Sequence, residues 1–176
     1  MPLVPDELSL ETARLILRRP SVDDAAVYRR LWTERDPRVP THRRISPEGR
    51  PTLADIAAQI TADNDEAGSG LLTVQRKGTD DVIGYCGLTA RGNGSPSEPE
   101  LAYELLRAVH NRGYATEAGE AVVAWAGAAG YRRLWAGVWN WNTSSRRVLE
   151  KLGFREVGRV EPESLHGYSL LTVKDL

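Results

Sequence analysis

Two spacings of apolar residues divide the chain into predicted strands and helices. Apolar and polar residues alternate, as in half-buried strands, in residues 12–19, 71–75, 82–88, 99–105, 134–138, 154–157 and 168–173. Apolar residues three and four positions apart predict helices in residues 21–31, 52–60, 118–129 and 142–152. This order predicts an α+β protein with about seven strands and about four helices, in which one mixed and mostly antiparallel sheet is twisted.

The first two predicted helices lie between the first two long strands and are joined by an irregular segment. Ser21 with Asp24, and Thr52 with Asp55, have the spacing of helix N-terminal caps. Residues 35–51 are rich in proline and arginine and are predicted to form a loop. Because charged surface loops often carry binding residues, this insertion is a candidate for the part that selects a substrate.

A turn around Gly113 joins a predicted strand to an alanine-rich helix. The first turn of a helix leaves backbone N–H groups without partners and carries the positive end of the helix dipole, so it can bind an anion. Gly113 allows close approach of the backbone, Ala115 and Thr116 are small, and Arg112 adds a positive charge. The sequence therefore predicts a phosphate site on the main chain of residues 111–116.

A second motif begins at Asn142 and ends with Gly153 and Phe154, as a capped helix followed by a strand does. Together with Gly-Tyr-Ala-Thr-Glu-Ala at residues 113–118, it resembles the GNAT superfamily of acyl-CoA N-acyltransferases, and most closely the ribosomal-protein N-terminal acetyltransferase-like branch. The resemblance covers about residues 10–174. It implies the GNAT fold, in which a bulged fourth strand splays from the fifth.

The resemblance also implies a reaction and a co-substrate. The expected activity is transfer of an acetyl group from acetyl-CoA to a primary amine by direct attack, with a protein N-terminal amine as the favoured acceptor among several that share the fold. The implied cofactor-binding residues are Tyr103, Glu104, Leu105, His110, Asn111, Arg112, Gly113, Tyr114, Ala115, Thr116, Asn142, Ser145 and Arg147.

Within this set, the resemblance assigns different parts of the cofactor to different residues. A bulge at Tyr103 to Leu105 would offer unpaired backbone groups to the pantetheine amides, with residues 134–138 as the parallel neighbour. Asn142 would lie near the arm, and Arg147 could face the adenine or the ribose phosphate. His110 is expected to position the turn.

Attack of an amine on a thioester needs a base for the ammonium, donors for the oxyanion and an acid for the thiolate. Ser145 is the candidate acid, because the family branch has serine there; the alternative is a hydroxyl that only belongs to the helix cap. This chain has Leu149 where many members have an acidic tyrosine, and Gly137 where many have a basic glutamate. Ser145 is therefore the one hydroxyl expected near the thiol.

The general base stays open. Glu100 and Glu104 lie on the same face of the predicted strand and are candidates for relaying the proton through water. Glu161 and Glu163 are candidates from a later loop. Solvation at the surface is the alternative role for each of them.

Aromatic residues cluster in and after the strand at residues 134–138. Trp135, Trp139 and Trp141 are expected in the core, since large aromatics in strands are usually buried. The alternative is one wall of an acceptor groove, with His166 and Tyr168 forming the opposite wall.

Composition limits the other possibilities. A chain of 176 residues with 41% hydrophobic residues and a net charge of −1 predicts one domain over residues 1–176 and no nucleic-acid partner. The single cysteine excludes an internal disulfide, and the three separated histidines give no metal site. The sequence shows neither a bilayer-spanning apolar run nor a secretory segment, so no membrane partner and a cytoplasmic location are expected. A homodimer is one option for the undetermined oligomeric state.

Two other functional classes can be compared with this interpretation. A Rossmann or P-loop nucleotide enzyme is excluded, because neither G-x-G-x-x-G nor G-x-x-x-x-G-K-[ST] occurs at the turn. A protein of the same fold that binds acyl-CoA without catalysis, as a sensor or partner protein, remains an alternative.

Overall fold

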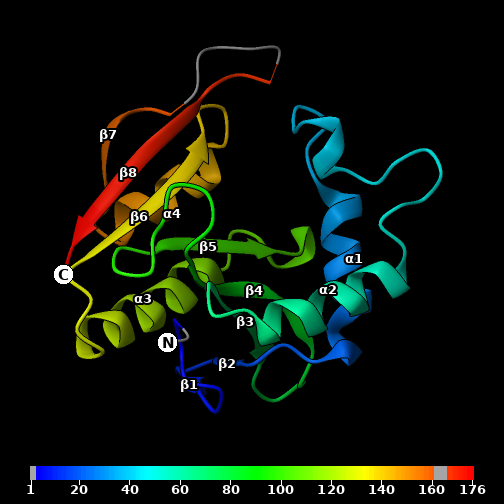
Figure 1. Cartoon of the computed structure of the whole chain (residues 1–176), viewed down its shortest axis with the longest axis horizontal. Helices are drawn as coiled ribbons and strands as arrows, with labels where there is room; N and C mark the ends of the chain where they lie inside the picture. Colours follow the sequence, from blue (N-terminus) through cyan, green and yellow to red (C-terminus); the bar gives the residue numbers. More distant parts are fainter. Residues whose placement is uncertain (1–2, 161–165) are drawn as a thin grey trace.

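The computed structural model describes residues 3–160 and 166–176. These residues form one eight-stranded sheet, in the order β1-β2-β3-β4-β5-β6-β8-β7, with helices on both faces (Figure 1). The strands are β1 (Leu10–Glu11), β2 (Leu15–Arg18), β3 (Ser69–Arg76), β4 (Val82–Thr89), β5 (Glu100–Leu105), β6 (Arg133–Trp139), β7 (Arg155–Arg159) and β8 (Ser169–Asp175). The α-helices are α1 (Ala25–Glu34), α2 (Leu53–Asp65), α3 (Tyr114–Ala128) and α4 (Thr143–Lys151).

The sheet is antiparallel except at one junction in its middle. β5 and β6 run parallel and pair only where Glu100 meets Trp135, so they diverge from that point. This confirms the α+β class and the predicted splay between these two strands. The eighth strand, which the alternation did not predict, is the two-residue β1.

The expectation of a bulge at Tyr103 to Leu105 is wrong. β5 pairs with β4 in unbroken register from Glu100 to Leu105. The irregularity lies one strand earlier, in the β3–β4 ladder next to Val74, close to Gly84 with its φ of 149°. The unpaired edge of β5 therefore arises from its divergence from β6.

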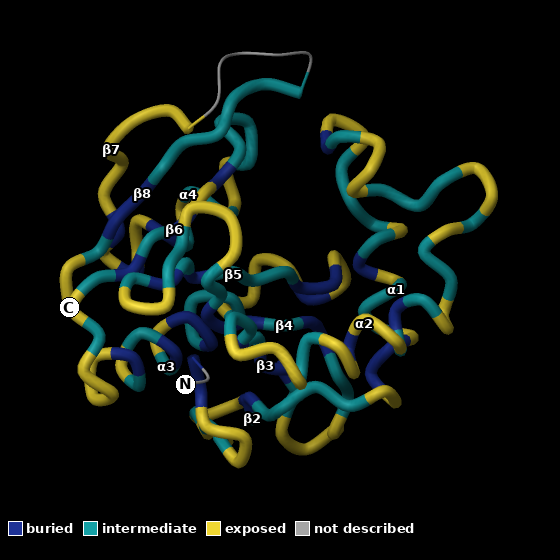
Figure 2. Tube along the Cα trace, viewed as in Figure 1, coloured by how far each residue is buried: buried dark blue, intermediate teal, exposed yellow. Residues whose placement is uncertain are grey.

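Helices cover the two faces of the central strands differently. Tyr28 of α1 packs edge-on against Tyr85 of β4 on one face, the face that Glu104 of β5 shares. α3 packs against β4 and β5 on the other face. The buried stretches run through these central strands, whereas β7 at the edge is exposed along its length (Figure 2).

Both predicted capping boxes are present at the start of the insertion's two helical segments. Ser21 and Asp24 exchange hydrogen bonds at the first, and Thr52 and Asp55 do so at the second. Asp24 is also buried at 3% exposure, and both its carboxylate oxygens accept hydrogen bonds from Arg18 of β2 at 2.9 Å. These contacts fix the insertion to the sheet.

Two features that would change the function are not found in the described part of the chain. No helix there combines the length and apolar character needed to cross a bilayer. No group of three or more His, Cys, Asp or Glu side chains in residues 3–160 and 166–176 is placed to hold a metal ion.

Candidate active site

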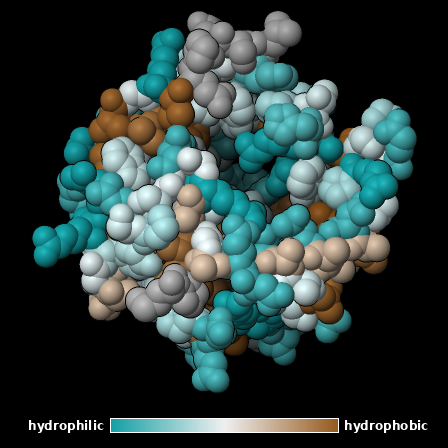
Figure 3. Space-filling model, in the orientation of Figure 1, coloured by the Kyte–Doolittle hydropathy of each residue, from teal (hydrophilic) through white to brown (hydrophobic). Residues whose placement is uncertain are grey.

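A cleft of about 940 Å³ lies between the insertion and the diverging strands. Its lining comes from the end of α1, the loop after it, β5, β6 and the first turns of α3 and α4. The surface is hollowed between these parts in the upper middle of Figure 3. The cleft therefore opens where the parallel strands β5 and β6 pair at a single position.

The cleft brings together nearly all the residues that the sequence assigned to cofactor binding. Tyr103, Glu104, Leu105, His110, Asn111, Gly113, Tyr114, Ala115, Thr116, Asn142, Ser145 and Arg147 line it, and Glu100 does too. Arg112 is the exception, because it is not part of the lining; its carbonyl accepts a hydrogen bond from Arg14. The positive charge expected from Arg112 is therefore not placed inside the cleft.

The first turn of α3 leaves backbone donors open toward the cleft. Gly113 has a φ of 79° and Asn111 a φ of 61°, and no side chain caps the helix. The first backbone N–H with a helical partner is that of Glu117, which donates to the Gly113 carbonyl. Such a turn can accept an anion on its main chain.

Two side chains hold this turn in place. Nε2 of His110 lies 2.8 Å from the Leu105 carbonyl oxygen, so the imidazole connects the turn to the end of β5, as its predicted positioning role requires. Glu117 accepts hydrogen bonds from the Thr12 hydroxyl and from Arg14. Although burial opposes it, these donors hold the pKa of Glu117 below its usual range. The carboxylate thus keeps α3 attached to the β1–β2 turn.

At the start of α4, the helix is capped by Asn142, and the Ser145 hydroxyl is not used as a cap. The Asn142 side chain accepts a hydrogen bond from the Ser145 backbone N–H at 3.1 Å, so asparagine caps the helix. The Ser145 hydroxyl instead donates to the Tyr103 hydroxyl at 2.9 Å. Tyr103 in turn donates to the Ser145 carbonyl at 2.9 Å.

Tyr103 corrects the expectation that Ser145 is the one hydroxyl near the thiol. Burial raises the pKa of Tyr103, while its hydrogen bond with Ser145 has the opposite effect, so the phenol keeps its proton at neutral pH. The side chain of Leu149, at the position where many relatives have tyrosine, is buried in the core. A phenol is therefore present beside α4, but β5 supplies it.

Glu104 is engaged by groups that the sequence did not predict. Arg35 donates to both carboxylate oxygens at 2.9 Å, and the Tyr85 hydroxyl donates to Oε2 at 3.0 Å. The Arg35 side chain is 13% exposed and its guanidinium lies 4.1 Å from the Trp32 ring centroid. Glu104 thus anchors the insertion to β5.

Glu100 reaches across the point where β5 and β6 diverge. Its Oε1 accepts a hydrogen bond from the Gly137 N–H and its Oε2 one from the Asn93 N–H, both at 3.0 Å. A Cβ at position 137 would lie 3.2 Å from Oε1. The carboxylate therefore packs directly against Gly137, where a larger residue would crowd it.

The expectation that the three tryptophans lie in the core is wrong, because all three are partly exposed, and two of them instead form a wall of the cleft. Trp139 and Trp141 line the cleft and stack with ring centroids 6.0 Å apart. Arg38 lies 4.2 Å above the Trp141 ring, and Trp141 Nε1 donates to the His166 carbonyl. Trp135 is not part of the lining and donates to Glu98.

The opposite wall expected from residues after β7 is only partly described. Nδ1 of His166 lies 3.1 Å from the Arg38 carbonyl oxygen, at the insertion. Tyr168 does not line the cleft, and its ring lies 3.9 Å below the Arg159 guanidinium. Glu161 and Glu163, the other candidate bases, fall outside the described residues.

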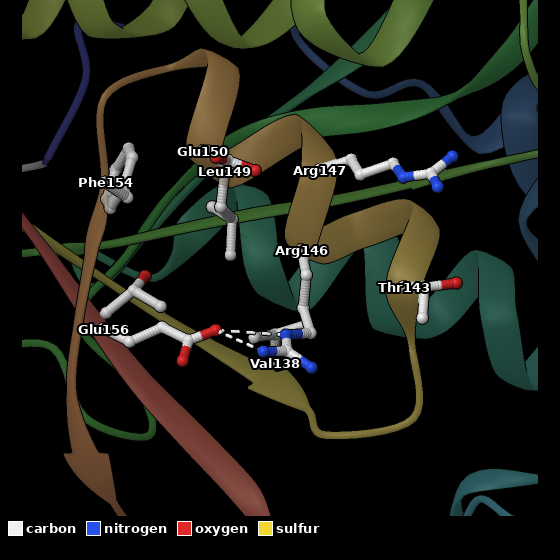
Figure 4. A pocket seen from close by; sticks show the side chains of 9 residues that line it. Val138, Thr143, Arg146, Arg147, Leu149, Glu150, Phe154 and Glu156 are labelled. Atoms are coloured by element: carbon white, nitrogen blue, oxygen red, sulfur yellow. Dashed lines mark hydrogen bonds and ion pairs between the residues drawn. The ribbon is translucent and has the colours of Figure 1, made fainter.

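A smaller cavity of about 490 Å³ lies on the other side of α4 (Figure 4). Val138, Leu149 and Phe154 form its apolar floor, and the ion pair between Arg146 and Glu156 closes one side. It contains none of the predicted catalytic residues.

Sequence reasoning missed the two groups that hold Glu104. Arg35 is 69 positions from Glu104 in the chain and Tyr85 is 19, so no motif spacing relates them. The charged insertion was a general signal that contacts to the site come from this region. The arginine that makes them could not be chosen among the five in residues 35–51.

Comparison with known proteins supports the interpretation of this geometry. A family model described as an acetyltransferase (GNAT) domain matches residues 14–155. An uncharacterized N-acetyltransferase p20 from Bacillus licheniformis is 30% identical over 154 residues, which are 85% of this chain and 84% of that protein.

Two solved structures share the fold. RimJ from Mycobacterium smegmatis in complex with CoA-disulfide is similar with a TM-score of 0.71 and 21% identity, over 99% of this chain and 89% of that one. A ribosomal-protein-S5-alanine acetyltransferase from Vibrio fischeri is similar with a TM-score of 0.69 and 18% identity, over 96% and 97% of the two chains. This chain belongs to the GNAT acetyltransferase family and is an enzyme that transfers an acetyl group to an amine.

Proposed function

We propose that the protein transfers the acetyl group of acetyl-CoA to an amine that enters the cleft from the side of the insertion. One observation carries this proposal: the open first turn of α3, the Ser145–Tyr103 hydroxyl pair and the Glu100 carboxylate all line the same cleft. The complex of RimJ with CoA-disulfide supports binding of CoA by this fold.

The cofactor is assigned to the α3 and α4 side of the cleft. The N–H groups of Tyr114 to Thr116 suit a pyrophosphate, since they are unpaired at the positive end of a helix. The free edge of β5 beyond Glu100 suits the pantetheine amides. Ser145 and Tyr103 then lie beside the thioester sulfur, where a hydroxyl can donate a proton as negative charge develops.

The acceptor is assigned to the opposite face of β5, where Glu100 and Glu104 lie. Glu104 is held by Arg35 and Tyr85, whereas Glu100 receives only two backbone N–H donors. A carboxylate oxygen has two lone pairs, so each Glu100 oxygen retains one that can accept a proton. Glu100 is therefore the better candidate for taking the proton from the attacking ammonium, directly or through one water.

The class of acceptor is proposed from the structural neighbours and from the cleft. The neighbour from Vibrio fischeri is described as acting on ribosomal protein S5 alanine, which supports a peptide N-terminal amine for this chain as well. The cleft is open to solvent between the insertion and β6, as entry of a chain end requires (Figure 3).

Binding and turnover of acetyl-CoA test the proposal together. Saturating acetyl-CoA or CoA is expected to raise the melting temperature, because a ligand that binds only the folded state stabilises it by mass action. A panel of amines, including peptides with free N-termini, is then screened for release of free CoA thiol. An unchanged melting temperature would contradict the cofactor site, and binding without thiol release from any amine would support the non-catalytic sensor.

Replacement of Glu100 by glutamine separates a base from a structural link between strands. Loss of the base is expected to lower kcat roughly 10- to 100-fold, at or below the lower limit of acid–base contributions because water can accept the proton instead. The control is Glu98→Gln, two residues earlier, whose carboxylate binds Trp135 outside the cleft. A lower melting temperature with kcat unchanged would assign Glu100 the structural role alone.

A further inference from the structure

The acceptor side of the cleft contains a cation without a carboxylate partner. Arg43 ends the short 3-10 segment Thr41–Arg43 of the insertion, is exposed and lines the cleft. Within residues 3–160 and 166–176 its guanidinium makes no ion pair, and its hydrogen bonds are made by its backbone, with Arg35 and Pro40. The Arg43 guanidinium is therefore available to bind a ligand.

The backbone that carries Arg43 is fixed to the floor of the cleft. Nη1 of Arg35 donates to the Arg43 carbonyl at 2.9 Å, while its other nitrogens bind Glu104. Burial and Glu104 raise the pKa of Tyr85, and the charges of Arg35 and Arg43 oppose that rise. Arg43 and Tyr85 line the same cleft, so the fixed backbone holds Arg43 at the rim of the region that contains Glu104.

The carboxylates around Arg43 are already neutralised by other groups. Arg35 binds Glu104, and Arg38 donates to both oxygens of Asp36 and lowers its pKa to about 2. Glu100 accepts two backbone N–H groups farther along β5. Among the charged residues of the insertion that line the cleft, Arg43 is the one without a partner of opposite charge in the described residues.

Apart from Arg35, the other arginines of the lining come from outside the insertion. Arg147 lies on α4 and Arg91 is paired with Asp63 and Glu66. Arg107 follows β5, and its backbone N–H donates to Glu34 of α1. Of the cleft arginines that lack a carboxylate partner in the described residues, Arg43 is the one that belongs to the insertion.

We propose that Arg43 binds a carboxylate of the acceptor and so selects amines that carry an acidic group. Arginine presents a planar fork of donors that fits a carboxylate with two parallel hydrogen bonds. The inference rests on the proposed function, because the amine is placed at Glu100. Glu100 and Glu104 are four residues apart, about 13 Å along a strand, so the carboxylate lies several bonds from the amine.

Two matched pairs of acceptors test this selection and distinguish free small molecules from peptides. The first pair is 4-aminobutyrate and 4-aminobutyramide, and the second is the peptide amides Ala-Asp-Ala and Ala-Asn-Ala. For each, kcat/KM is measured at saturating acetyl-CoA. The wild-type enzyme is expected to favour the carboxylate member of at least one pair by about tenfold or more, in the range of a charged hydrogen bond.

Variants at position 43 identify the residue responsible. Arg43→Glu is expected to abolish or reverse the preference, and Arg43→Lys to keep part of it, since lysine retains the charge but not the fork. Arg50→Gln is the matched control, because Arg50 is an exposed arginine of the same insertion that does not line the cleft. Its preference is expected to equal that of the wild type.

Each remaining outcome counts against the inference. Equal kcat/KM for both members of both pairs, a preference for the amides, no acetylation of any of the four, or a carboxylate preference that survives in Arg43→Glu would overturn it. Failure of the proposed function looks different, because acetyl-CoA would then neither raise the melting temperature nor release thiol with any amine of the wider panel. The two failures are therefore distinguishable.

Discussion

Replacement of Ser145 by alanine is expected to lower kcat roughly 10- to 1000-fold while KM for acetyl-CoA changes little. A hydroxyl that donates to sulfur only as negative charge develops stabilises the transition state and not the bound thioester. Stability is expected to change little, because Asn142 and not Ser145 caps α4. Steady-state kinetics at a temperature well below the melting point measure the effect.

Tyr103→Phe provides the matched second variant, because it removes the partner hydroxyl and keeps the ring. Since Ser145 and Tyr103 are hydrogen-bonded to each other, their effects on kcat are expected to be non-additive in the double variant. A Ser145→Ala enzyme with wild-type kcat would remove Ser145 from the mechanism. A loss confined to Tyr103→Phe would assign the proton donor to the phenol.

Gly113→Val is expected to abolish binding of CoA, with a loss of affinity of about 100-fold or more, at least about 2.7 kcal/mol. Gly113 has a φ of 79°, which a β-branched residue rarely adopts, and a Cβ there would lie 3.4 Å from the Arg14 guanidinium. The open turn where the pyrophosphate is placed would therefore have to change its backbone. Calorimetry of CoA binding to the folded variant measures the change.

The same helix offers a control for the backbone strain alone. Gly130 follows the other end of α3 with a φ of 96°, and a Cβ there would meet no atom within 4 Å. Gly130→Val is therefore expected to lower the melting temperature while CoA affinity stays at the wild-type value. If Gly113→Val also binds CoA normally, the pyrophosphate is held elsewhere.

Local patterns were sufficient for most of the fold. The capping pairs at Ser21 and Thr52 form as predicted, because such caps depend on atoms only three residues apart. The turn at Gly113 joins strand to helix as predicted, and its left-handed backbone likewise depends only on neighbouring residues. The divergence of β5 from β6 was implied by family resemblance. Its physical origin, a ladder that ends after one pair with no bulge in β5, is visible only in the assembled sheet.

The side-chain contacts that complete the candidate site join residues far apart in the chain, so local patterns do not predict them. Tyr103 was predicted to contact the cofactor, yet its hydroxyl meets Ser145 across 42 positions of the chain. Glu100 was one of several candidate bases, and its contact with Gly137 crosses two strands that are joined through α3. Side-chain partners of this kind depend on how strands and helices pack, and sequence spacing does not record it.

The sequence by itself determined the order of elements, the helix caps, the anion-binding turn and the family, because each is encoded in residues close together along the chain. Tertiary structure alone decided that Arg35 anchors Glu104, that Glu100 fills the space beside Gly137 and that Arg43 remains unpaired in the cleft. These arrangements depend on burial and on the balance of charges between distant segments, and both quantities exist only once the insertion is folded onto the sheet.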